Sequence, residues 1–327
     1  MLTGIFDAAR LIPDDLRGRK DSLPLTIITG FLGAGKTTLV NRLLSGAHGR
    51  KLAILVNDFG SVNIDAELIA ARDESSISLS NGCACCSVAG DLIAALLRLT
   101  QRPELPDAIV LEASGLADPR GIAQIALANP LLRLDGILAL VDAETFVDRA
   151  EDPVTAAVLR PQLSAADLIV LNKTDLLRHS KEMLLARIES LAPGKTILES
   201  VHSALPADVV LGIGAAHSAG FFCVEGGKHE TPFRSFSMSW PEPLNRNRLE
   251  SSLRQLPRNI IRAKGVFHFE GSGSERFVYQ RVGERSSLSP DAGGLAGDNV
   301  SRFVAIGPAA TFDASAVEGC FAKLGLI

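Results

Sequence analysis

The sequence contains no long run of apolar residues. Its longest runs, such as LAILV and GILALV, have the length of a single strand, whereas a membrane-spanning helix needs roughly 20 apolar residues. The first fifteen residues, MLTGIFDAARLIPDD, also lack the basic and apolar regions of a secretory signal and carry acidic residues instead. We therefore expect a cytoplasmic protein that does not associate with a membrane.

The sequence also has few cysteines and no excess of positive charge. The five cysteines are an odd number, and three of them cluster at residues 83–86 while Cys223 and Cys320 lie far away. This arrangement does not fit a secreted disulfide framework. The formal net charge of −4 argues against a dedicated nucleic-acid binder. With 327 residues, of which 46% are hydrophobic, the chain can bury a large core and form two domains.

The first two thirds of the chain alternate short apolar runs with amphipathic segments. Helices are expected at residues 36–45, 89–100, 119–128 and 181–192. Strands are expected at residues 25–29, 52–57, 77–79, 108–112, 137–142, 168–172 and 196–199. This alternation predicts an α/β fold in which helices cover a mainly parallel sheet.

The pattern changes after residue 205, where periodicity is lost and glycine and proline are frequent. We expect a linker at residues 212–231, between an α/β domain of residues 23–211 and a smaller domain of residues 232–327. Residues 1–22 would form an N-terminal extension. In the last domain, VFHFE and RFVYQRV flank the glycine-rich GSGSE as in a hairpin. The strand-like RFVAIG and a helix at 314–323 complete a predicted α+β domain with a mainly antiparallel sheet.

The segment TGFLGAGKTTL, residues 29–39, matches the phosphate-binding loop G-x-x-x-x-G-K-[ST]. Glycines let backbone N–H groups surround a β-phosphate at the positive end of the following helix. The lysine brings charge to the β- and γ-phosphates, and the threonine hydroxyl can bind magnesium. A turn that binds nothing is the alternative, which the location between a strand and a helix disfavours. The expected nucleotide contacts are Gly33, Ala34, Gly35, Lys36, Thr37 and Thr38.

The segment LIVLNKTDLL contains Asn172, Lys173 and Asp175 in the order N-K-x-D, the pattern by which GTPases recognise guanine. Asp175 can accept hydrogen bonds from the guanine ring N–H and the exocyclic amino group, which adenine does not offer in that geometry. A buried carboxylate left unpaired opposite adenine would be costly. A polar turn at a strand end would also explain the tetrapeptide alone, but its place downstream of a phosphate loop favours guanine.

Two acidic residues at strand ends are candidates for magnesium binding and hydrolysis. Glu112 lies in LEASG, and Asp58 lies in VNDFGS. Together with Thr37 they can supply oxygen ligands to magnesium, and together with Lys36 they form the predicted catalytic set. For Asp58 a solvated loop position is the alternative. We interpret Asp142, in LVDA, as structural.

The segment NGCACCSV contains Cys83, Cys85 and Cys86 between a predicted strand and a predicted helix. In a parallel sheet such a loop lies at the carboxyl edge, where ligands bind. Three thiolates leave the fourth zinc position open, as in exchangeable or catalytic sites, and soft ligands favour zinc, cobalt(II) or copper(I). A C-x-x-C redox pair and buried small apolar side chains remain alternatives.

The segments GFLGAGKTTLVNRLL, NDFGSVNID, LSNGCACCSVAGDL, EASGLADP and NKTDL resemble, in order and approximate spacing, the motifs of the CobW-type P-loop GTPases. RAKGVFHFE and the closing helix resemble the C-terminal domain of that family. The resemblance implies a metallochaperone that uses GTP and Mg²⁺ and carries Zn²⁺ or Co²⁺ on the three cysteines. It also implies a client metalloprotein or metal-insertion complex as partner and allows for a homodimer. Relatives serve zinc homeostasis, cobalamin synthesis or nitrile hydratase maturation.

The sequence departs from the family pattern at three places. Asp58 stands where the family usually has Glu, and Ser61 stands where a second acid is common, which removes one metal carboxylate. The interdomain segment holds only His217 and His229, so we expect no large metal-storage role there. We therefore expect a GTP-hydrolysing metal chaperone or insertase. A metal-responsive regulatory GTPase is the alternative, and a P-loop kinase is disfavoured by N-K-x-D.

Overall fold

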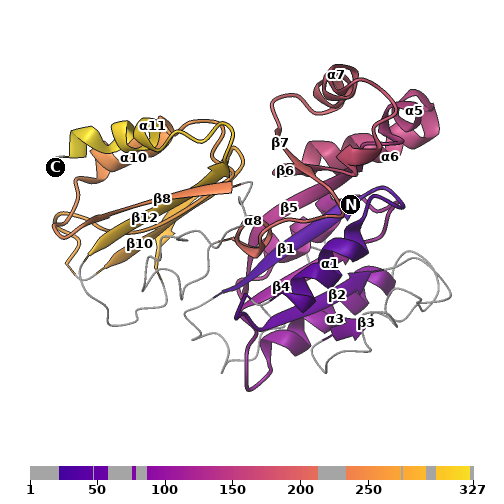
Figure 1. The fold of residues 1–327 in the computed structure, drawn as a ribbon. Helices are drawn as coiled ribbons and strands as arrows, with labels where there is room; N and C mark the ends of the chain where they lie inside the picture. The colour runs from indigo at the N-terminus through magenta and orange to yellow at the C-terminus, as the bar shows by residue number, and fades with distance from the viewer. Residues whose placement is uncertain are drawn as a thin grey trace, which may run out of the picture. The chain divides into compact units, whose positions relative to one another are not determined.

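The computed structural model describes residues 22–46, 48–57, 76–78, 87–212, 233–273, 275–291 and 300–324. The chain divides into two compact units, Met1–Ala207 and Asp208–Ile327. Each unit has its own sheet and its own helices (Figure 1). None of the helices in these ranges has the length and apolar character needed to cross a membrane.

A seven-stranded sheet with the order β3-β2-β4-β1-β5-β6-β7 forms the centre of the first unit. Every neighbouring pair in it is parallel, which confirms the predicted α/β fold. Its strands are β1 (Leu23–Gly30), β2 (Leu52–Asn57), β3 (Ser76–Ser78), β4 (Ala108–Ala113), β5 (Leu132–Asp142), β6 (Leu168–Asn172) and β7 (Thr196–Ser200).

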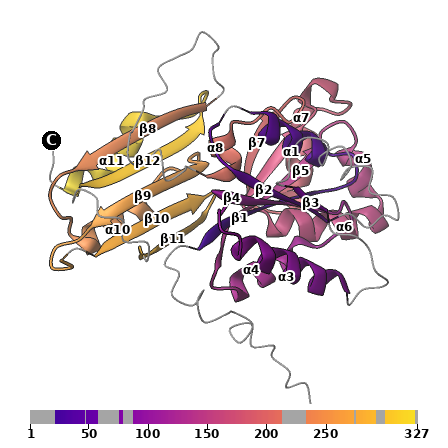
Figure 2. The same ribbon diagram turned by 90° about the horizontal axis from the view of Figure 1, so that it is seen from below.

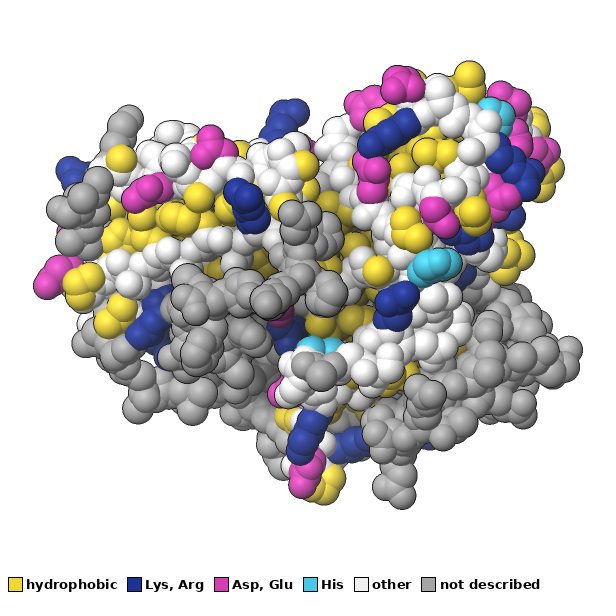
Figure 3. Space-filling model, in the orientation of Figure 1, with side chains coloured by type: hydrophobic (Ala, Val, Ile, Leu, Met, Phe, Trp, Pro, Cys, Tyr) yellow, Lys and Arg dark blue, Asp and Glu magenta, His cyan; other side chains and the backbone are white. Residues whose placement is uncertain are grey.

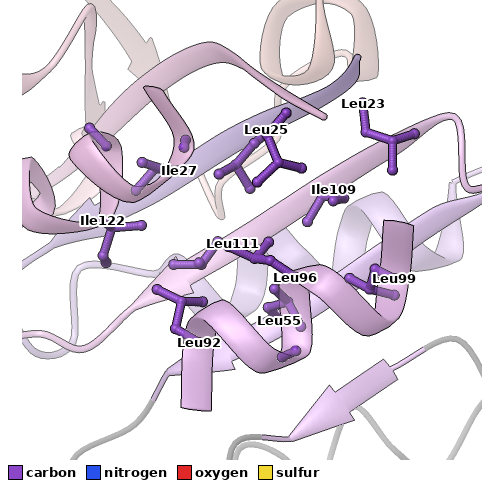
Figure 4. Close-up of a cluster of buried hydrophobic side chains, with 14 of the residues drawn as sticks. Leu23, Leu25, Ile27, Leu55, Leu92, Leu96, Leu99, Ile109, Leu111 and Ile122 are labelled. Atoms are coloured by element: carbon purple, nitrogen blue, oxygen red, sulfur yellow. The ribbon is translucent and has the colours of Figure 1, made fainter. Parts of the chain in front are cut away.

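Helices cover both faces of this sheet, and Figure 2 shows α3 and α4 on the face opposite α1. The helices are α1 (Lys36–Ser45), α3 (Ser87–Thr100), α4 (Pro119–Ala128), α5 (Phe146–Glu151), α6 (Pro153–Ala165) and α7 (Lys181–Leu191). Leucines of α3 pack on apolar side chains of the central strands (Figure 4). The sheet is therefore buried on both faces, which explains why its strands are continuously apolar rather than alternating.

Several elements of this unit differ from the sequence prediction; for example, β1 begins at Leu23 instead of residue 25. Helices α5 and α6 were not predicted; Pro153 and Pro161 interrupt the apolar pattern there, although Pro153 occupies the first turn of α6 and Asp152 caps it. Strand β5 begins at Leu132 instead of residue 137, because its pairing with β1 starts at Leu23↔Leu132 and continues past the polar Asp135. Helix α3 begins two residues before the expected start.

The second unit contains a five-stranded antiparallel sheet with the order β11-β10-β9-β12-β8. Its strands are β8 (Phe233–Trp240), β9 (Arg262–His268), β10 (Arg276–Val282), β11 (Arg285–Pro290) and β12 (Ser301–Pro308), and its helices are α8 (Ala207–Leu211), α10 (Arg246–Arg254) and α11 (Ala314–Phe321), followed by the 3₁₀ helix Ala322–Leu324. The hairpin of β9 and β10 confirms the prediction made from GSGSE. Strand β11 was not predicted, because serines occupy three of its six positions.

Aromatic side chains build the core of the second unit. The ring of Phe321, on α11, lies 5.3 Å from the ring of Trp240 and 4.9 Å from that of Phe303, measured between centroids. These contacts hold α11 against β8 and β12.

A buried arginine connects the sheet of this unit to α8. Arg262 of β9 donates hydrogen bonds to the carbonyl oxygens of Val209 (2.8 Å) and Val210 (2.5 Å) in α8.

Charged side chains of both signs gather over α5 and α7 of the first unit (Figure 3). His179 lies 2.9 Å from Asp148, Lys181 lies 2.5 Å from Glu199, and Arg178 pairs with Glu144. These pairs are at least partly exposed, so each contributes little to stability. The mixture of signs marks a solvated face rather than a binding patch of one charge.

Candidate nucleotide-binding site

The phosphate loop connects β1, the central strand of the sheet, to α1. Gly35 caps α1 with a φ angle of 102°, in the left-handed region that favours glycine. A Cβ atom at this position would also lie 2.4 Å from Nδ2 of Asn172. Glycine is therefore required here both by the backbone angle and by the close approach of Asn172.

A cavity of about 330 Å³ lies at the carboxyl ends of β1, β2 and β4. Ligands bind at this edge in open α/β sheets, and the volume falls at the lower end of the range of small-molecule sites. Of the residues predicted to contact nucleotide, the phosphate-loop glycines 33 and 35 and the first residues of α1 line it directly. The lining consists of Leu32, Gly33, Gly35, Lys36, Thr37, Thr38, Val56, Glu112, Ala113, Ser114 and Gly115.

Lys36 and Thr37, which are adjacent in the sequence, meet the distant Glu112 in this cavity. Glu112 is the penultimate residue of β4, which lies beside β1, and it is 5% exposed. Its Oε1 accepts a 2.8 Å hydrogen bond from the Thr37 hydroxyl. The Lys36 Nζ donates to the carbonyl oxygen of Phe31 at 3.3 Å, within the loop itself. A hydroxyl and a carboxylate at this spacing offer the oxygen ligands that magnesium prefers.

Asn172, at the end of β6, ties the phosphate loop to the segment after β7. Its Nδ2 donates to Ala34 O (2.9 Å) and to Ser203 Oγ (3.0 Å), and its Oδ1 accepts from the Ser203 N–H (2.8 Å). The Ser203 hydroxyl in turn donates to Gly35 O at 3.0 Å. The Asn172 amide thus links the phosphate loop to the turn at Ser203.

Ser203 is a residue of this site that the sequence analysis missed. It is fully buried, and both His202 and Ser203 have positive φ angles, 53° and 56°. Non-glycine residues in this region carry strain on the order of 1–3 kcal/mol each and persist only when their surroundings hold them. The hydrogen bonds of Ser203 with Asn172 and Gly35 hold it in this conformation. The sequence SVHSALP contains no glycine or motif that would predict the turn.

Lys173 and Asp175 follow Asn172 at the edge of the site. Lys173 has a left-handed backbone, with φ 62°, and its Nζ lies 2.8 Å from Oδ2 of Asp142. Asp142 is buried, which agrees with the structural role expected for it. Asp175 lies in a short 3₁₀ helix, Thr174–Leu176, and is exposed. The ion pair fixes the lysine stem beside the strand end, while the carboxylate of Asp175 stays accessible.

The remaining predicted site residues lie outside the described ranges: Asp58, Cys83, Cys85 and Cys86. The elements that flank them are described, and β2, which ends at Asn57, lies between β3 and β4 in the sheet. Strand β3 ends at Ser78 and α3 begins at Ser87. Within the described ranges, no three His, Cys, Asp or Glu residues are grouped closely enough to hold a metal ion.

Comparisons with known proteins identify relatives of the chain. It is 36% identical over 231 residues to the zinc chaperone CobW of Sinorhizobium sp, covering 61% of this chain and 64% of the relative. It is 40% identical over 185 residues to the zinc chaperone YjiA of Escherichia coli K12, covering 54% and 57%. The chain thus spans less than two thirds of the length of these two relatives.

A third relative is covered more fully. The zinc chaperone CobW of Pseudomonas aeruginosa is 33% identical over 335 residues, covering 87% of each chain. The crystal structure of the Zn(II)-bound YjiA GTPase from E. coli covers 94% of this chain and 100% of its own, at 23% identity and a TM-score of 0.43. At that score the structural likeness is weak, so the family assignment rests on the sequence matches.

Family models account for both units. The model of the CobW/HypB/UreG nucleotide-binding domain matches residues 24–199, and the model of the cobalamin synthesis protein cobW C-terminal domain matches residues 233–324. The first match covers more than half of the chain. The chain therefore belongs to the CobW/HypB/UreG family and combines its nucleotide-binding domain with a CobW C-terminal domain, as the sequence motifs indicated.

Proposed function

We propose that the protein is a GTP-hydrolysing metallochaperone that couples its nucleotide state to the binding and delivery of a transition metal, zinc or cobalt. The observation that carries the hydrolytic part is the meeting of Thr37 and Glu112, 2.8 Å apart, in a cavity walled by the phosphate loop. The relatives named as zinc chaperones support the metal-delivery part. A "zinc-regulated GTPase metalloprotein activator 1" of Dictyostelium discoideum, 26% identical over 298 residues, supports it further.

The cavity fits a magnesium nucleotide through its own residues. Thr37 and Glu112 would hold Mg²⁺, with Asp58 as a third candidate, and the ion would neutralise charge on the phosphates. The Lys36 ammonium group would give up its hydrogen bond to the Phe31 carbonyl oxygen and donate to the β- and γ-phosphate oxygens instead. The loop amides of Gly33 to Thr38 would surround the β-phosphate at the positive end of α1. Lys36, Glu112 and Asp58 form the proposed catalytic set.

Guanine would be selected at the opposite end of the site. The exposed Asp175 carboxylate would accept hydrogen bonds from the guanine ring, and the stem of Lys173, anchored by Asp142, would lie along the base. Asn172 would hold the phosphate loop and the Ser203 turn together, so that one nucleotide can contact both ends of the site.

We place the protein in the cytoplasm and propose that it acts on a client metalloprotein or metal-insertion complex. The proposal includes a homodimer.

The cargo metal would bind Cys83, Cys85 and Cys86 as three thiolate ligands and leave one position open for transfer. In this scheme GTP orders the loops that follow β2 and β3, and hydrolysis loosens them and releases the metal. Strands β2 and β3 run parallel to β1, so their carboxyl ends lie at the edge of the sheet where the phosphate loop begins. One conformational change can therefore reach both sites.

Cobalt(II) titration of the anaerobic protein should produce intense visible absorption from tetrahedral thiolate coordination, and each single replacement of Cys83, Cys85 or Cys86 by Ser should weaken it. Cys320→Ser is the matched control. Burial raises the pKa of the Cys320 thiol, which keeps it protonated and a poor ligand, so this variant should behave like the wild type. Absorption that survives all three loop substitutions would exclude the thiolate site. Metal binding without transfer to a client would favour a sensing GTPase.

A further inference from the structure

A buried glutamine of α6 holds the turn that follows Glu112. Gln162 is 1% exposed, and its Nε2 donates to Gly115 O at 3.0 Å and to Ala117 O at 3.2 Å. Both partners are carbonyl oxygens, which can only accept, so the amide nitrogen must face them. Within the described part of the chain, no donor reaches Oε1 of Gln162, which is also buried.

The same turn is held on another side by the phosphate loop. A Cβ atom at Gly115 would lie 2.5 Å from Cδ2 and 2.9 Å from the backbone N of Leu32, so only glycine permits this approach. A hydrogen bond from Ala117 N to Ser114 O, 3.0 Å, closes the turn. Ser114 and Gly115 also line the nucleotide cavity beside Glu112. The turn of residues 114–117 is thus packed between the phosphate loop and Gln162.

The chemistry of Gln162 suits a turn that occupies two positions. A buried acceptor without a donor costs free energy, and because the large majority of buried polar atoms in native proteins have a partner, such an atom calls for an explanation. Each trans peptide carries its N–H opposite its C=O. If a peptide of the turn rotates, it presents an N–H to α6, and a rotated Gln162 amide can then accept with Oε1. The glutamine amide donates two hydrogen bonds and also accepts, without carrying a charge.

We propose that Gln162 is a positioning residue that sets the 114–117 turn according to the nucleotide bound, so that the site distinguishes a nucleoside triphosphate from a diphosphate. This inference rests on the proposed function, because it takes GTP as the ligand. The turn directly follows Glu112, which contacts the proposed magnesium ligand Thr37. It therefore lies where the terminal phosphate of a bound triphosphate changes the surroundings most. Gln162 acts through the turn and needs no contact with the nucleotide.

The test compares Gln162→Met, which keeps the length and loses the amide, with Gln162→Glu, whose buried carboxyl can donate at most one hydrogen bond in place of the two that the amide donates. Gln124→Met, at an exposed position of α4, is the matched control. Fluorescent GDP and a non-hydrolysable GTP analogue report affinities, and phosphate release reports kcat. Both Gln162 variants should bind GDP within about threefold of the wild type and lose about tenfold or more in analogue affinity or kcat. The control should change neither.

A merely structural role would lower the affinities for both nucleotides equally, and that result, or unchanged values, would overturn the inference. Hydrogen exchange of wild-type peptides covering residues 113–118 supplies a second test that needs no variant. Their protection should differ between the GDP and analogue complexes, and identical protection would contradict the proposal. A wild type that bound no GTP would overturn the proposed function together with this inference. Normal wild-type binding, with both the affinity ratio and kcat unchanged in the variants, would overturn this inference alone.

Discussion

Replacing Lys36 with alanine is expected to lower GTP turnover by about two to three orders of magnitude, because preorganised charge at a transferring phosphoryl group is typically worth that much. Lys36 sits in the first turn of α1 and lines the cavity. The loss should appear in kcat more than in KM, since the charge that the lysine stabilises grows in the transition state.

The fold should survive this substitution. The side chain of Lys36 is buried, at 7% exposure, but it belongs to no hydrophobic cluster of the unit. Phosphate release and the far-ultraviolet spectrum are the two measurements. Lys51→Ala, at a surface lysine paired with Glu104, is the control and should retain activity. A variant that keeps full turnover would remove Lys36 from the mechanism, and a lost spectrum would make it structural.

Asp175→Asn is expected to weaken GTP binding by about a hundredfold or more and to improve the binding of xanthosine triphosphate. The amide donates where the carboxylate only accepted, which suits the xanthine oxygen and opposes the guanine amino group. Sites built to hydrogen-bond a particular group discriminate by such factors. Because Asp175 is exposed in a short 3₁₀ helix, the change should leave stability nearly unaltered.

Competition binding with the two triphosphates measures this exchange, and Glu182→Gln, at an exposed position of α7, is a matched charge-removing control. The control should keep the wild-type preference for GTP. Equal affinity of the wild type for ATP and GTP would refute guanine recognition by Asp175.

Short sequence patterns were enough to predict the bounds of α1, the parallel sheet and the phosphate loop. Helix α1 begins at Lys36 and ends at Ser45 as expected, since a glycine stands at each end, Gly35 and Gly46. The order of the apolar runs predicted a parallel sheet, because a strand buried on both faces must be apolar throughout. The phosphate loop was predictable for a similar reason: its backbone angles restrict the residue type at defined positions.

Long-range contacts determine what the sequence could not predict. The N-K-x-D motif did not predict that the Asn172 amide joins Ala34, which is 138 residues away, to the turn at Ser203. Gln162 and Ser203 belong to no motif, and their importance depends on which carbonyl groups the fold brings to them. The extension of β5 to Leu132 likewise depends on its partner β1 rather than on its own apolar pattern.

The central claim is that nucleotide and metal binding share one conformational change. Zinc affinity should be measured by competition with a chelating indicator for the nucleotide-free protein, the GDP complex and the complex with a non-hydrolysable GTP analogue. Coupling of about 1–3 kcal/mol predicts that the analogue tightens zinc binding roughly 5- to 150-fold, and linkage requires zinc to tighten analogue binding by the same factor. The same zinc affinity in all three nucleotide states would contradict the account and leave a GTPase whose metal site is independent of its nucleotide.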